Sequence, residues 1–322
     1  MPATIVTEDN FIVAETDRYF SEHVSKHPVN TVRHAREPSG PNNQFVITEN
    51  QDVLYSHALV DTRGGATITN PDWDYFSVIQ IIDENQYTLD VLYPGQSRTL
   101  TPDDLTLGSY VFLNMRTGLK GLDPQSLAES HAHQDGLKIE ARSAIPYQPK
   151  GFDRASLDAV RTELISHARE IKDVEKAFGL PEETEPRTRL VAAAAGWGGL
   201  PVAHAAYIAS IKPGPEAAKG KCARMTLPRP PLKFDKGAFF SVTTYGPDSW
   251  IKTENFAVNN RRAKANPDGS VTFRFNCPGQ PNNIDTVGDW ILMIRLYQAE
   301  SVEKILEYMK NVQENVIVEV CN

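Results

Sequence analysis

The sequence predicts a mainly β protein of two sandwich-like domains joined by a helical segment, and three observations support this prediction. The chain has 322 residues, about twice the length of a typical domain. Short stretches of alternating polarity, separated by clusters of Gly, Pro, Asn and Asp, are typical of antiparallel sandwiches. Residues 153–178 instead carry apolar side chains at every third or fourth position, which indicates a helix between two β regions.

The first β region is expected to follow an N-terminal helix. Between residues 11 and 24 apolar side chains recur on one face of a helix, and Pro28 soon afterwards predicts its end. Residues 37–43 contain two prolines, a glycine and two asparagines, which indicates a loop. The strands expected after it cover residues 44–48, 53–61, 66–69, 75–83, 87–93 and 109–116.

The helical segment and the second β region follow. Gly179 and Pro181 end the long helix, and a second helix is expected over residues 186–195 with Thr184 as its cap. Further strands are expected over residues 203–210, 238–245, 250–258, 271–276 and 290–297, then a helix over 301–310 and an edge strand over 316–320. The predicted organisation is an N-terminal helix (1–28), a first β-sandwich (29–122), a helical segment (123–200) and a second β-sandwich with a C-terminal helix (201–322).

The charge of the chain restricts its partners. There are 33 Lys and Arg residues against 41 Asp and Glu, a formal net charge of −8, and the basic residues are scattered. Nucleic acids and anionic membranes bind clustered basic residues, so we expect neither as a partner. We expect a homo-oligomer, of an order that the sequence does not specify.

Simple features of the sequence predict the cellular location of the protein and the redox state of its cysteines. No uncharged run approaches the ~18 residues of a membrane span, and residues 1–10 lack the features of a signal peptide, so a cytoplasmic protein is expected. Cys222, Cys277 and Cys321 are too few and too widely spaced for a disulfide framework or a metal knuckle. We therefore expect free thiols.

Established catalytic and cofactor signatures are absent from the sequence. It contains no Gly-x-Ser-x-Gly elbow, Walker loop, His-Glu-x-x-His motif or dinucleotide fingerprint. His131 and His133 have the spacing of a metal-binding pair on a strand, but residues 123–129 are typical of a helix start, and positions two apart on a helix point about 200° apart. We therefore expect no metal and no cofactor, and the sequence leaves open whether the protein is an enzyme.

Residues 50–57 concentrate polar side chains at the start of a predicted strand. Asp52 is suited to act as a general base and Tyr55 as a hydrogen-bonding acid, provided that both face a cleft. The two side chains converge only if Asp52 still lies in the turn before the strand, because neighbouring positions of a strand alternate between faces. In the structural alternative Asp52 caps a turn and Tyr55 packs in the core.

Three further residues are candidate contacts of a ligand. Arg261 lies in the Asn-Asn-Arg-Arg run of residues 259–262, and an arginine there suits either a clamp on a carboxylate or phosphate or a tie between a sheet and a loop. Trp197 lies in the glycine-rich turn of residues 196–199 and is suited to line a pocket. Arg116, at the end of a predicted strand, is the third candidate.

Several strings resemble a known family. Residues 50–56, Asn-Gln-Asp-Val-Leu-Tyr-Ser, with Ala-Leu-Val-Asp at 58–61, resemble the signature of the DUF1254 family, a domain of unknown function. The strings that resemble its usual partner domain, DUF1214, lie at residues 239–245, 254–255, 257–261, 268–270 and 296–297. The resemblance covers most of residues 30–300 and implies an immunoglobulin-like first sandwich, a helical insert and a jelly-roll-like second sandwich, without a particular activity.

The resemblance also adds one residue to the predicted site and shows three departures. A family-like segment at residues 30–34 makes His34 a candidate neighbour of Asp52. Val53 stands where the family has Thr, residues 94–108 look shortened, and the Trp- and Pro-rich ending of the family is absent. A pocket built from these parts is therefore expected to differ from the corresponding pocket of other family members.

The leading hypothesis is a protein that binds a small molecule or a glycan at a polar site of the first sandwich, with hydrolysis as an option. In this hypothesis Asp52 is the base or anchor, His34 a proton carrier near neutral pH, and Tyr55 an orienting donor. The expected ligand contacts are Asn50, Arg116, Trp197 and Arg261. The alternative is a structural or interaction protein that assembles through its β-sandwiches.

Overall fold

The computed structural model describes residues 3–44, 47–171 and 173–321, and these divide into two compact units. Unit 1 comprises Met1–Ala35, Tyr55–Thr117 and His131–Val202, and unit 2 comprises Arg36–Leu54, Gly118–Ser130 and Ala203–Asn322. Each unit is therefore assembled from segments that are distant in the sequence. The predicted fold class, mainly β with sandwiches and a helical insert, is confirmed, with sixteen strands in four sheets among the described residues.

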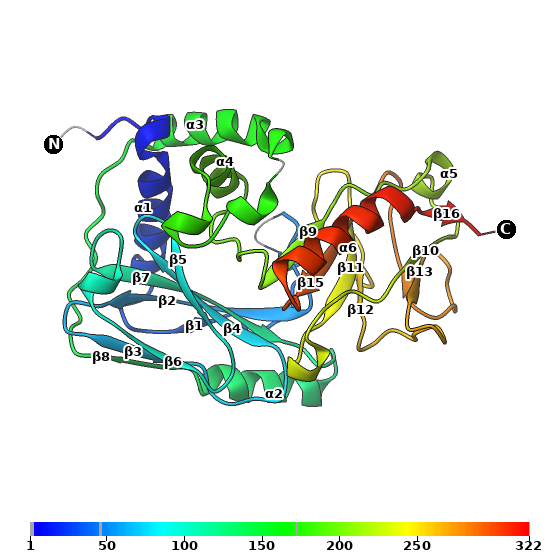
Figure 1. The fold of residues 1–322 in the computed structure, drawn as a ribbon, viewed down its shortest axis with the longest axis horizontal. Helices are drawn as coiled ribbons and strands as arrows, with labels where there is room; N and C mark the ends of the chain where they lie inside the picture. The colour runs from blue at the N-terminus through cyan, green and yellow to red at the C-terminus, as the bar shows by residue number, and fades with distance from the viewer. Residues whose placement is uncertain (1–2, 45–46, 172, 322) are drawn as a thin grey trace. The chain divides into compact units, whose positions relative to one another are not determined.

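Unit 1 contains a sandwich of two sheets (Figure 1). The larger sheet has the order β1-β2-β7-β4-β5, from Arg33–His34, Val53–Asp61, Tyr110–Gly118, Ser77–Asp83 and Thr88–Leu92. The smaller sheet has the order β6-β3-β8, from Ser97–Leu100, Ala66–Thr69 and Lys138–Ala141. Ile79 and Leu113 of the larger sheet share one buried apolar cluster with Ile68 of the smaller, which is the burial that holds the two layers together.

Helices cover the other face of the large sheet of unit 1 (Figure 1). They are α1 (Phe11–Val24), α3 (Arg154–Ser166) and α4 (Pro186–Gly196), with the short 3-10 turns η1 (Glu8–Asn10), η2 (Pro102–Asp104), η3 (Ala168–Glu170), η4 (Val174–Lys176) and η5 (Pro181–Glu183) elsewhere in the unit. Phe20 of α1 is fully buried and stacks on Phe112 of β7, with ring centroids 5.9 Å apart. The apolar stripe of α1 is thus what attaches the helical layer to the sheet.

The long helix predicted over residues 153–178 is shorter than expected. The Asp153 side chain caps its start by accepting the backbone N–H of Ser156 at 2.7 Å, but α3 ends at Ser166. Beyond it Ala168 and Ile171 still pack against the helical core, although they lie in or beside short turns. Apolar spacing indicates which side of a segment is buried, and a chain of short turns satisfies it as well as a continuous helix does.

Unit 2 contains two four-stranded sheets. The first has the order β12-β11-β15-β9, from Ala257–Asn259, Phe240–Tyr245, Ile291–Tyr297 and Ala205–Ile208, and the second has the order β14-β13-β10-β16, from Asn283–Ile284, Val271–Phe275, Ala223–Leu227 and Glu319–Val320. The rings of Phe240 and Phe273, one from each sheet, meet edge to face with centroids 6.5 Å apart. The remaining elements are α5 (Pro215–Ala218), η6 (Phe234–Lys236) and α6 (Val302–Asn315), and α2 (Pro124–Asp135) crosses the sequence boundary between the units.

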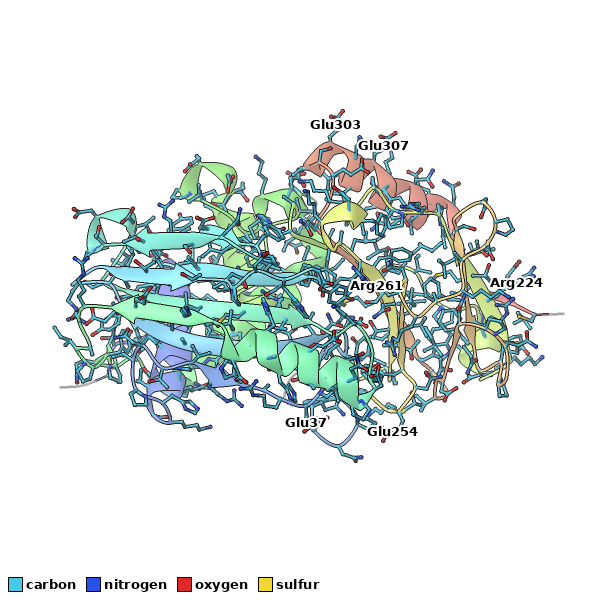
Figure 2. All side chains as sticks on the ribbon, turned by 90° about the horizontal axis from the view of Figure 1, so that it is seen from below. Glu37, Arg224, Glu254, Arg261, Glu303 and Glu307 are labelled. Atoms are coloured by element: carbon cyan, nitrogen blue, oxygen red, sulfur yellow. A yellow bond between two sulfur atoms is a disulfide. The ribbon has the colours of Figure 1, made fainter. Side chains whose placement is uncertain are left out.

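Helix α6 illustrates how the sequence pattern sets orientation in unit 2. Its Ile305, Met309 and Val312 are buried, whereas Glu303 and Glu307 project outward (Figure 2). The Ser301 side chain accepts the backbone N–H of Lys304 and fixes the start of the helix.

Other details differ from the sequence-based prediction. Residues 47 and 48 of the strand predicted over 44–48 lie in a turn, and its residues 45 and 46 fall outside the described part of the chain. His131 and His133 lie on a helix, as predicted. None of the helices in the described residues is both long enough and apolar enough to span a bilayer.

The expectation of three free thiols is wrong. Cys222 and Cys277 form a disulfide across a sequence separation of 55, and of the described cysteines only Cys321 is free. Cys222 directly precedes β10, Cys277 lies two residues beyond β13, and these strands are antiparallel neighbours. The pairing depends on this strand order, which sequence spacing does not reveal.

Candidate functional site

The signature segment Asn50 to Asp52 is held by a buried network within unit 2. The Asn50 amide donates to the Tyr297 hydroxyl at 2.7 Å, and its carbonyl oxygen accepts the backbone N–H of Asp52 at 2.9 Å. The backbone carbonyl of Asp52 in turn accepts the N–H of Leu119 at 2.9 Å. Asn50 and Asp52 are only 2% and 1% exposed, so both belong to the interior of the unit.

The Asp52 carboxylate connects this segment to the end of β12. Its Oδ1 accepts from the Asn259 amide at 2.9 Å and lies 3.4 Å from the Arg262 guanidinium. Asn259 Oδ1 accepts the backbone N–H groups of Arg261 and Arg262, both at 3.1 Å. The second carboxylate oxygen of Asp52 is buried and has no hydrogen-bond partner among the described residues.

The predicted contact Arg261 is thus linked to Asp52 through its backbone N–H and the Asn259 side chain. Its side chain is exposed (Figure 2). The neighbouring Arg262, which the sequence analysis did not single out, makes the ion pair with Asp52 instead. Consecutive positions of a turn point in different directions, so a run of two arginines does not show which one reaches inward.

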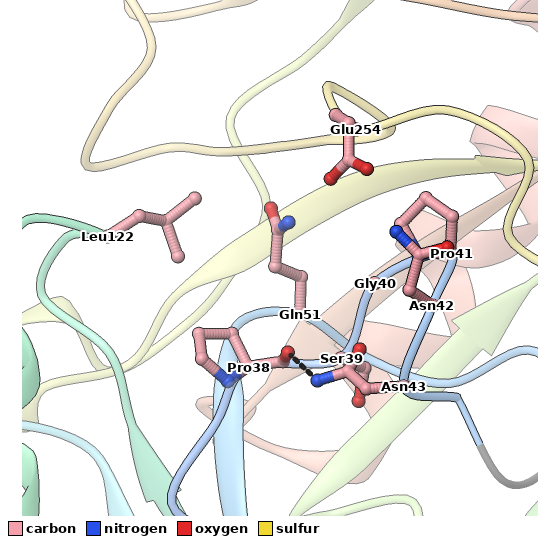
Figure 3. A pocket seen from close by; sticks show the side chains of 9 residues that line it. All are labelled: Pro38, Ser39, Gly40, Pro41, Asn42, Asn43, Gln51, Leu122 and Glu254. Carbon is pink, nitrogen blue, oxygen red and sulfur yellow. Dashed lines mark hydrogen bonds between the residues drawn. The ribbon is translucent and has the colours of Figure 1, made fainter.

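Between the two inward-facing residues, Gln51 points the other way into a hollow of unit 2 (Figure 3). The hollow has a volume of about 260 Å³ and is lined by Pro38, Ser39, Gly40, Pro41, Asn42, Asn43, Gln51, Leu122 and Glu254. Gln51 is only 7% exposed, and within the described residues its side-chain amide makes no hydrogen bond. A nearly buried amide therefore faces open space with its hydrogen-bonding capacity unused.

The loop that forms one wall of the hollow is fastened by amide side chains. Gln44 and Ile251 exchange two hydrogen bonds: the Gln44 amide donates to the Ile251 carbonyl at 3.0 Å and accepts its backbone N–H at 2.7 Å. The Asn43 amide donates to the Pro38 carbonyl at 2.9 Å (Figure 3). The first pair sets the loop beside the segment that carries Glu254, whose carboxylate faces Gln51 across the hollow.

In unit 1, His34 lies on β1 and contacts a serine. Its Nδ1 is 2.8 Å from the hydroxyl of Ser56, its cross-strand partner on β2. The amide of Gln134 donates to the same hydroxyl at 2.9 Å. This arrangement gives His34 a fixed orientation within unit 1.

Tyr55 and Arg116 lie close together on the helix-covered face of the large sheet of unit 1. The Arg116 guanidinium is 5.8 Å from the centroid of the Tyr55 ring and donates to the Gln80 side chain at 3.1 Å and to the Gly198 carbonyl at 3.2 Å. Arg116 is only 6% exposed, and no carboxylate of the described residues pairs with it. This cation is therefore solvated by neutral groups alone.

The surroundings of Arg116 carry an excess of positive charge. His57 lies beside Tyr55, with ring centroids 6.2 Å apart. Burial, with smaller contributions from the charges of Arg33, His23 and Arg116, lowers the pKa of His57 to about 3. His57 is therefore neutral at pH 7, because a further charge here would be desolvated beside other cations.

Trp197 is fastened to α1 in the helical layer. Its indole N–H donates to the Thr16 hydroxyl at 3.0 Å, and its ring stacks on Tyr19 with centroids 4.1 Å apart. The ring remains partly exposed. It is thus fixed in one orientation on the same side of the large sheet as Phe112, which it meets edge to face.

The predicted site residues form two groups. Asn50, Asp52 and Arg261 belong to unit 2, whereas His34, Tyr55, Arg116 and Trp197 belong to unit 1. The residues that sequence reasoning missed include Gln51, inside the signature string, and Glu254, some two hundred positions away. The sequence did not mark Gln51, because the inward direction of its neighbours Asn50 and Asp52 is known only from the structure.

The similarity of one solved structure supports this fold. The structure is similar to that of the VPA0106 protein from Vibrio parahaemolyticus, with a TM-score of 0.73, 15% identity and 97% of each chain covered. A putative uncharacterized protein from Burkholderia cenocepacia gives a TM-score of 0.48 at 17% identity, over 91% of this chain and 86% of that one. No curated protein matches the chain. Residues 29–108, which contain the signature segment, match the family described as "Protein of unknown function (DUF1254)".

Proposed function

We propose that the protein binds a small polar molecule in the hollow of unit 2, with Gln51 as the central contact. The observation that carries this proposal is the nearly buried, unpartnered amide of Gln51 directed into that space. The polar atoms of this amide face the hollow and are not sealed from solvent. A ligand that pairs with them replaces a hydrogen bond to water, for a net gain of about 0.5–1.5 kcal/mol.

The lining supports a compact ligand rich in hydroxyl groups. The hollow offers the amides of Gln51 and Asn42, the hydroxyl of Ser39 and the carboxylate of Glu254, with Leu122 and two prolines as apolar wall. Amides and a carboxylate suit the hydroxyl groups of a saccharide or polyol. Its volume of about 260 Å³ lies just below the ~300–1,000 Å³ of pockets for drug-sized ligands and suits a single sugar ring.

In this proposal the signature residues on either side of Gln51 act as its support. Asn50 is held by Tyr297 and Asp52 by Asn259, so the peptide between them has one orientation. The hydrolytic version, with Asp52, His34 and Tyr55 as acid and base groups, has less support because Asp52 is 1% exposed.

Isothermal titration of the protein with mono- and disaccharides, polyols and small amines tests the proposal. We expect a hydroxyl-rich member of this panel to bind and Gln51→Ala to weaken it by about tenfold or more, since one hydrogen bond in such a site contributes roughly 1.5 kcal/mol. Gln313→Ala, on the exposed face of α6, is the matched control and should bind like the wild type. Equal affinity of Gln51→Ala and wild type would place the ligand elsewhere.

Detection of product in the same mixtures of protein and compound separates binding from hydrolysis. Product release by the wild type, lost in Asp52→Asn at unchanged stability, would support the catalytic version. If no compound binds and Asp52→Asn is destabilised, the alternative of a structural protein gains support.

The finer expectations from the sequence also remain proposals. They are the DUF1214-like character of the second β region, the homo-oligomer and the cytoplasmic location. The Cys222–Cys277 disulfide weighs against the last of these, because disulfides persist mainly in oxidising compartments. Cell fractionation with thiol trapping tests the location, and light scattering tests the oligomer.

A further inference from the structure

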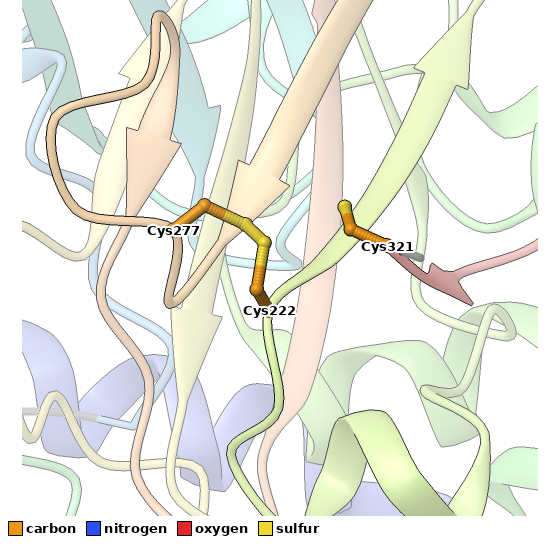
Figure 4. A group of neighbouring side chains, drawn as sticks. All are labelled: Cys222, Cys277 and Cys321. Carbon is orange, nitrogen blue, oxygen red and sulfur yellow. A yellow bond between two sulfur atoms is a disulfide. The ribbon is translucent and has the colours of Figure 1, made fainter.

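Three sulfur atoms meet at one end of the second sheet of unit 2. Cys222 and Cys277 form the disulfide, and the free thiol of Cys321 lies within 4.8 Å of both sulfur atoms (Figure 4). Cys277 is 3% exposed, whereas Cys321 is partly exposed. A partly exposed thiol thus stands beside a disulfide whose Cys222 half is also partly exposed and whose Cys277 half is buried.

The backbone holds Cys321 in this position. The strand β16 pairs with β10 in antiparallel register, with Val320 opposite Ala223, and the Cys321 N–H donates to the Cys222 carbonyl at 2.9 Å. An ion pair of 2.8 Å between Arg224 and Glu319 joins the same two strands. Cys321 and Cys222 are therefore the next cross-strand partners of this ladder.

We propose that these three cysteines form a thiol–disulfide exchange site. The Cys321 thiol loses its proton to water, and its thiolate attacks Sγ of Cys222. The Cys222–Cys321 bond forms while the Cys222–Cys277 bond breaks. The electron pair of the broken bond goes to Sγ of Cys277, which takes up a proton, so one disulfide and one thiol are present before and after and no oxidant is needed.

The register decides which sulfur is attacked. Directly opposed residues of antiparallel strands have Cα atoms about 4.5–5.5 Å apart, and disulfides need about 4.4–6.8 Å. Cys222 and Cys321 meet this requirement without backbone movement. Cys277 instead follows β13 and has no such register with β16.

Exchange changes what the cross-link holds. In the starting state it joins the entrance of β10 to the segment after β13. After exchange it joins β10 to the C-terminal strand β16 and leaves Cys277 as a buried thiol. The exchange therefore moves the cross-link of β10 from the segment after β13 to the edge strand β16.

Peptide mapping tests the proposal, because trypsin places the three cysteines in different peptides, residues 222–224, 275–295 and 311–322. The full chain is purified without reductant, alkylated over hours under native conditions and digested. Mass spectrometry should find the Cys222–Cys321 link besides Cys222–Cys277, with alkylated Cys277 in the wild type. In Cys321→Ser, alkylation of Cys277 should fall by about tenfold or more, since no internal thiol remains to release it. Equal labelling of Cys277 in both proteins, or none in the wild type, overturns the proposal.

A second pair of variants tests the direction of attack independently of the native disulfide. With oxidised glutathione as oxidant, Cys277→Ser should form the Cys222–Cys321 link faster than Cys222→Ser forms Cys277–Cys321. Circular dichroism establishes that each variant is folded. The reverse order of rates would contradict attack at Cys222.

Discussion

Two buried charged side chains, Asp52 in unit 2 and Arg116 in unit 1, differ in how their charges are neutralised. In unit 2 the Asp52 carboxylate has an amide and a guanidinium as partners. In unit 1 the Arg116 guanidinium has only neutral acceptors, beside other basic groups. The first arrangement stabilises a backbone conformation, whereas the second leaves a cation without a counter-ion among the described residues. Burial of a charged side chain alone therefore does not show whether its charge is neutralised.

The largest effect is expected at Asp52. Asp52→Ala leaves the Asn259 amide without its acceptor and the Arg262 guanidinium with the Ala257 carbonyl but without its carboxylate, so we expect a loss of about 3 kcal/mol in the free energy of unfolding. Asp52→Asn keeps one oxygen for Asn259 and should cost only ~1 kcal/mol. Urea denaturation measures both. Equal losses would show that the carboxylate is not held as a paired anion.

We expect acid to destabilise unit 1 through the protonation of His57. The pKa of His57 falls from 6.5 to about 3 on folding, so between these values the unfolded chain binds a proton that the folded chain does not. Stability is therefore lost as the pH falls through this window. His57→Asn should flatten the dependence of the melting temperature on pH between pH 6.5 and about 4.5. His131→Asn, on α2, is the control, and an equal slope in wild type and His57→Asn would contradict the account.

A smaller effect is expected where one neutral hydrogen bond is removed. Tyr297→Phe deletes the acceptor of the Asn50 amide and should reduce the free energy of unfolding by roughly 1 kcal/mol. Tyr207→Phe, at a more exposed hydroxyl on β9, is the matched control. A neutral Tyr297→Phe would mean that Asn50 does not depend on this bond, and Gln51 would then lack one of its two supports.

The smallest effect on stability is expected at Arg116. Arg116→Met removes a desolvated cation that has no carboxylate partner, but it also leaves the buried side-chain oxygen of Gln80 without its donor. Because these two effects oppose each other, the free energy of unfolding should change by less than about 1 kcal/mol. Acetate and other small carboxylates should raise the melting temperature of the wild type more than that of this variant. A large loss of stability in Arg116→Met, without any response to anions, would place Arg116 with the structural groups.

The sequence predicted many of the strands but missed β6, β8, β10 and β14, and it predicted none of the contacts between strands. Residues 77–83, 240–245, 271–275 and 291–297 were recognisable because alternation records two faces, and this is a local property. The helix over 153–178 was overestimated because short packed turns preserve the same apolar spacing. Local patterns thus report burial more reliably than they report the length of an element.

The candidate site depended on long-range neighbours. The signature string drew attention to Asp52, but its partner Asn259 lies some two hundred positions away, as does Glu254 across the hollow from Gln51. The Cys222–Cys277 disulfide was missed for the same reason, because it follows from the order of strands in a sheet. Nothing local in a single sequence specifies such pairs.

The most direct test of the central claim is an NMR titration that observes the side-chain NH2 group of Gln51. In ¹⁵N-labelled protein its two resonances, assigned by their disappearance in Gln51→Ala, are followed while a saccharide that binds in the calorimetric panel is added. The account predicts that these resonances shift with the same dissociation constant as calorimetry reports. Unchanged Gln51 resonances at saturating saccharide would contradict it.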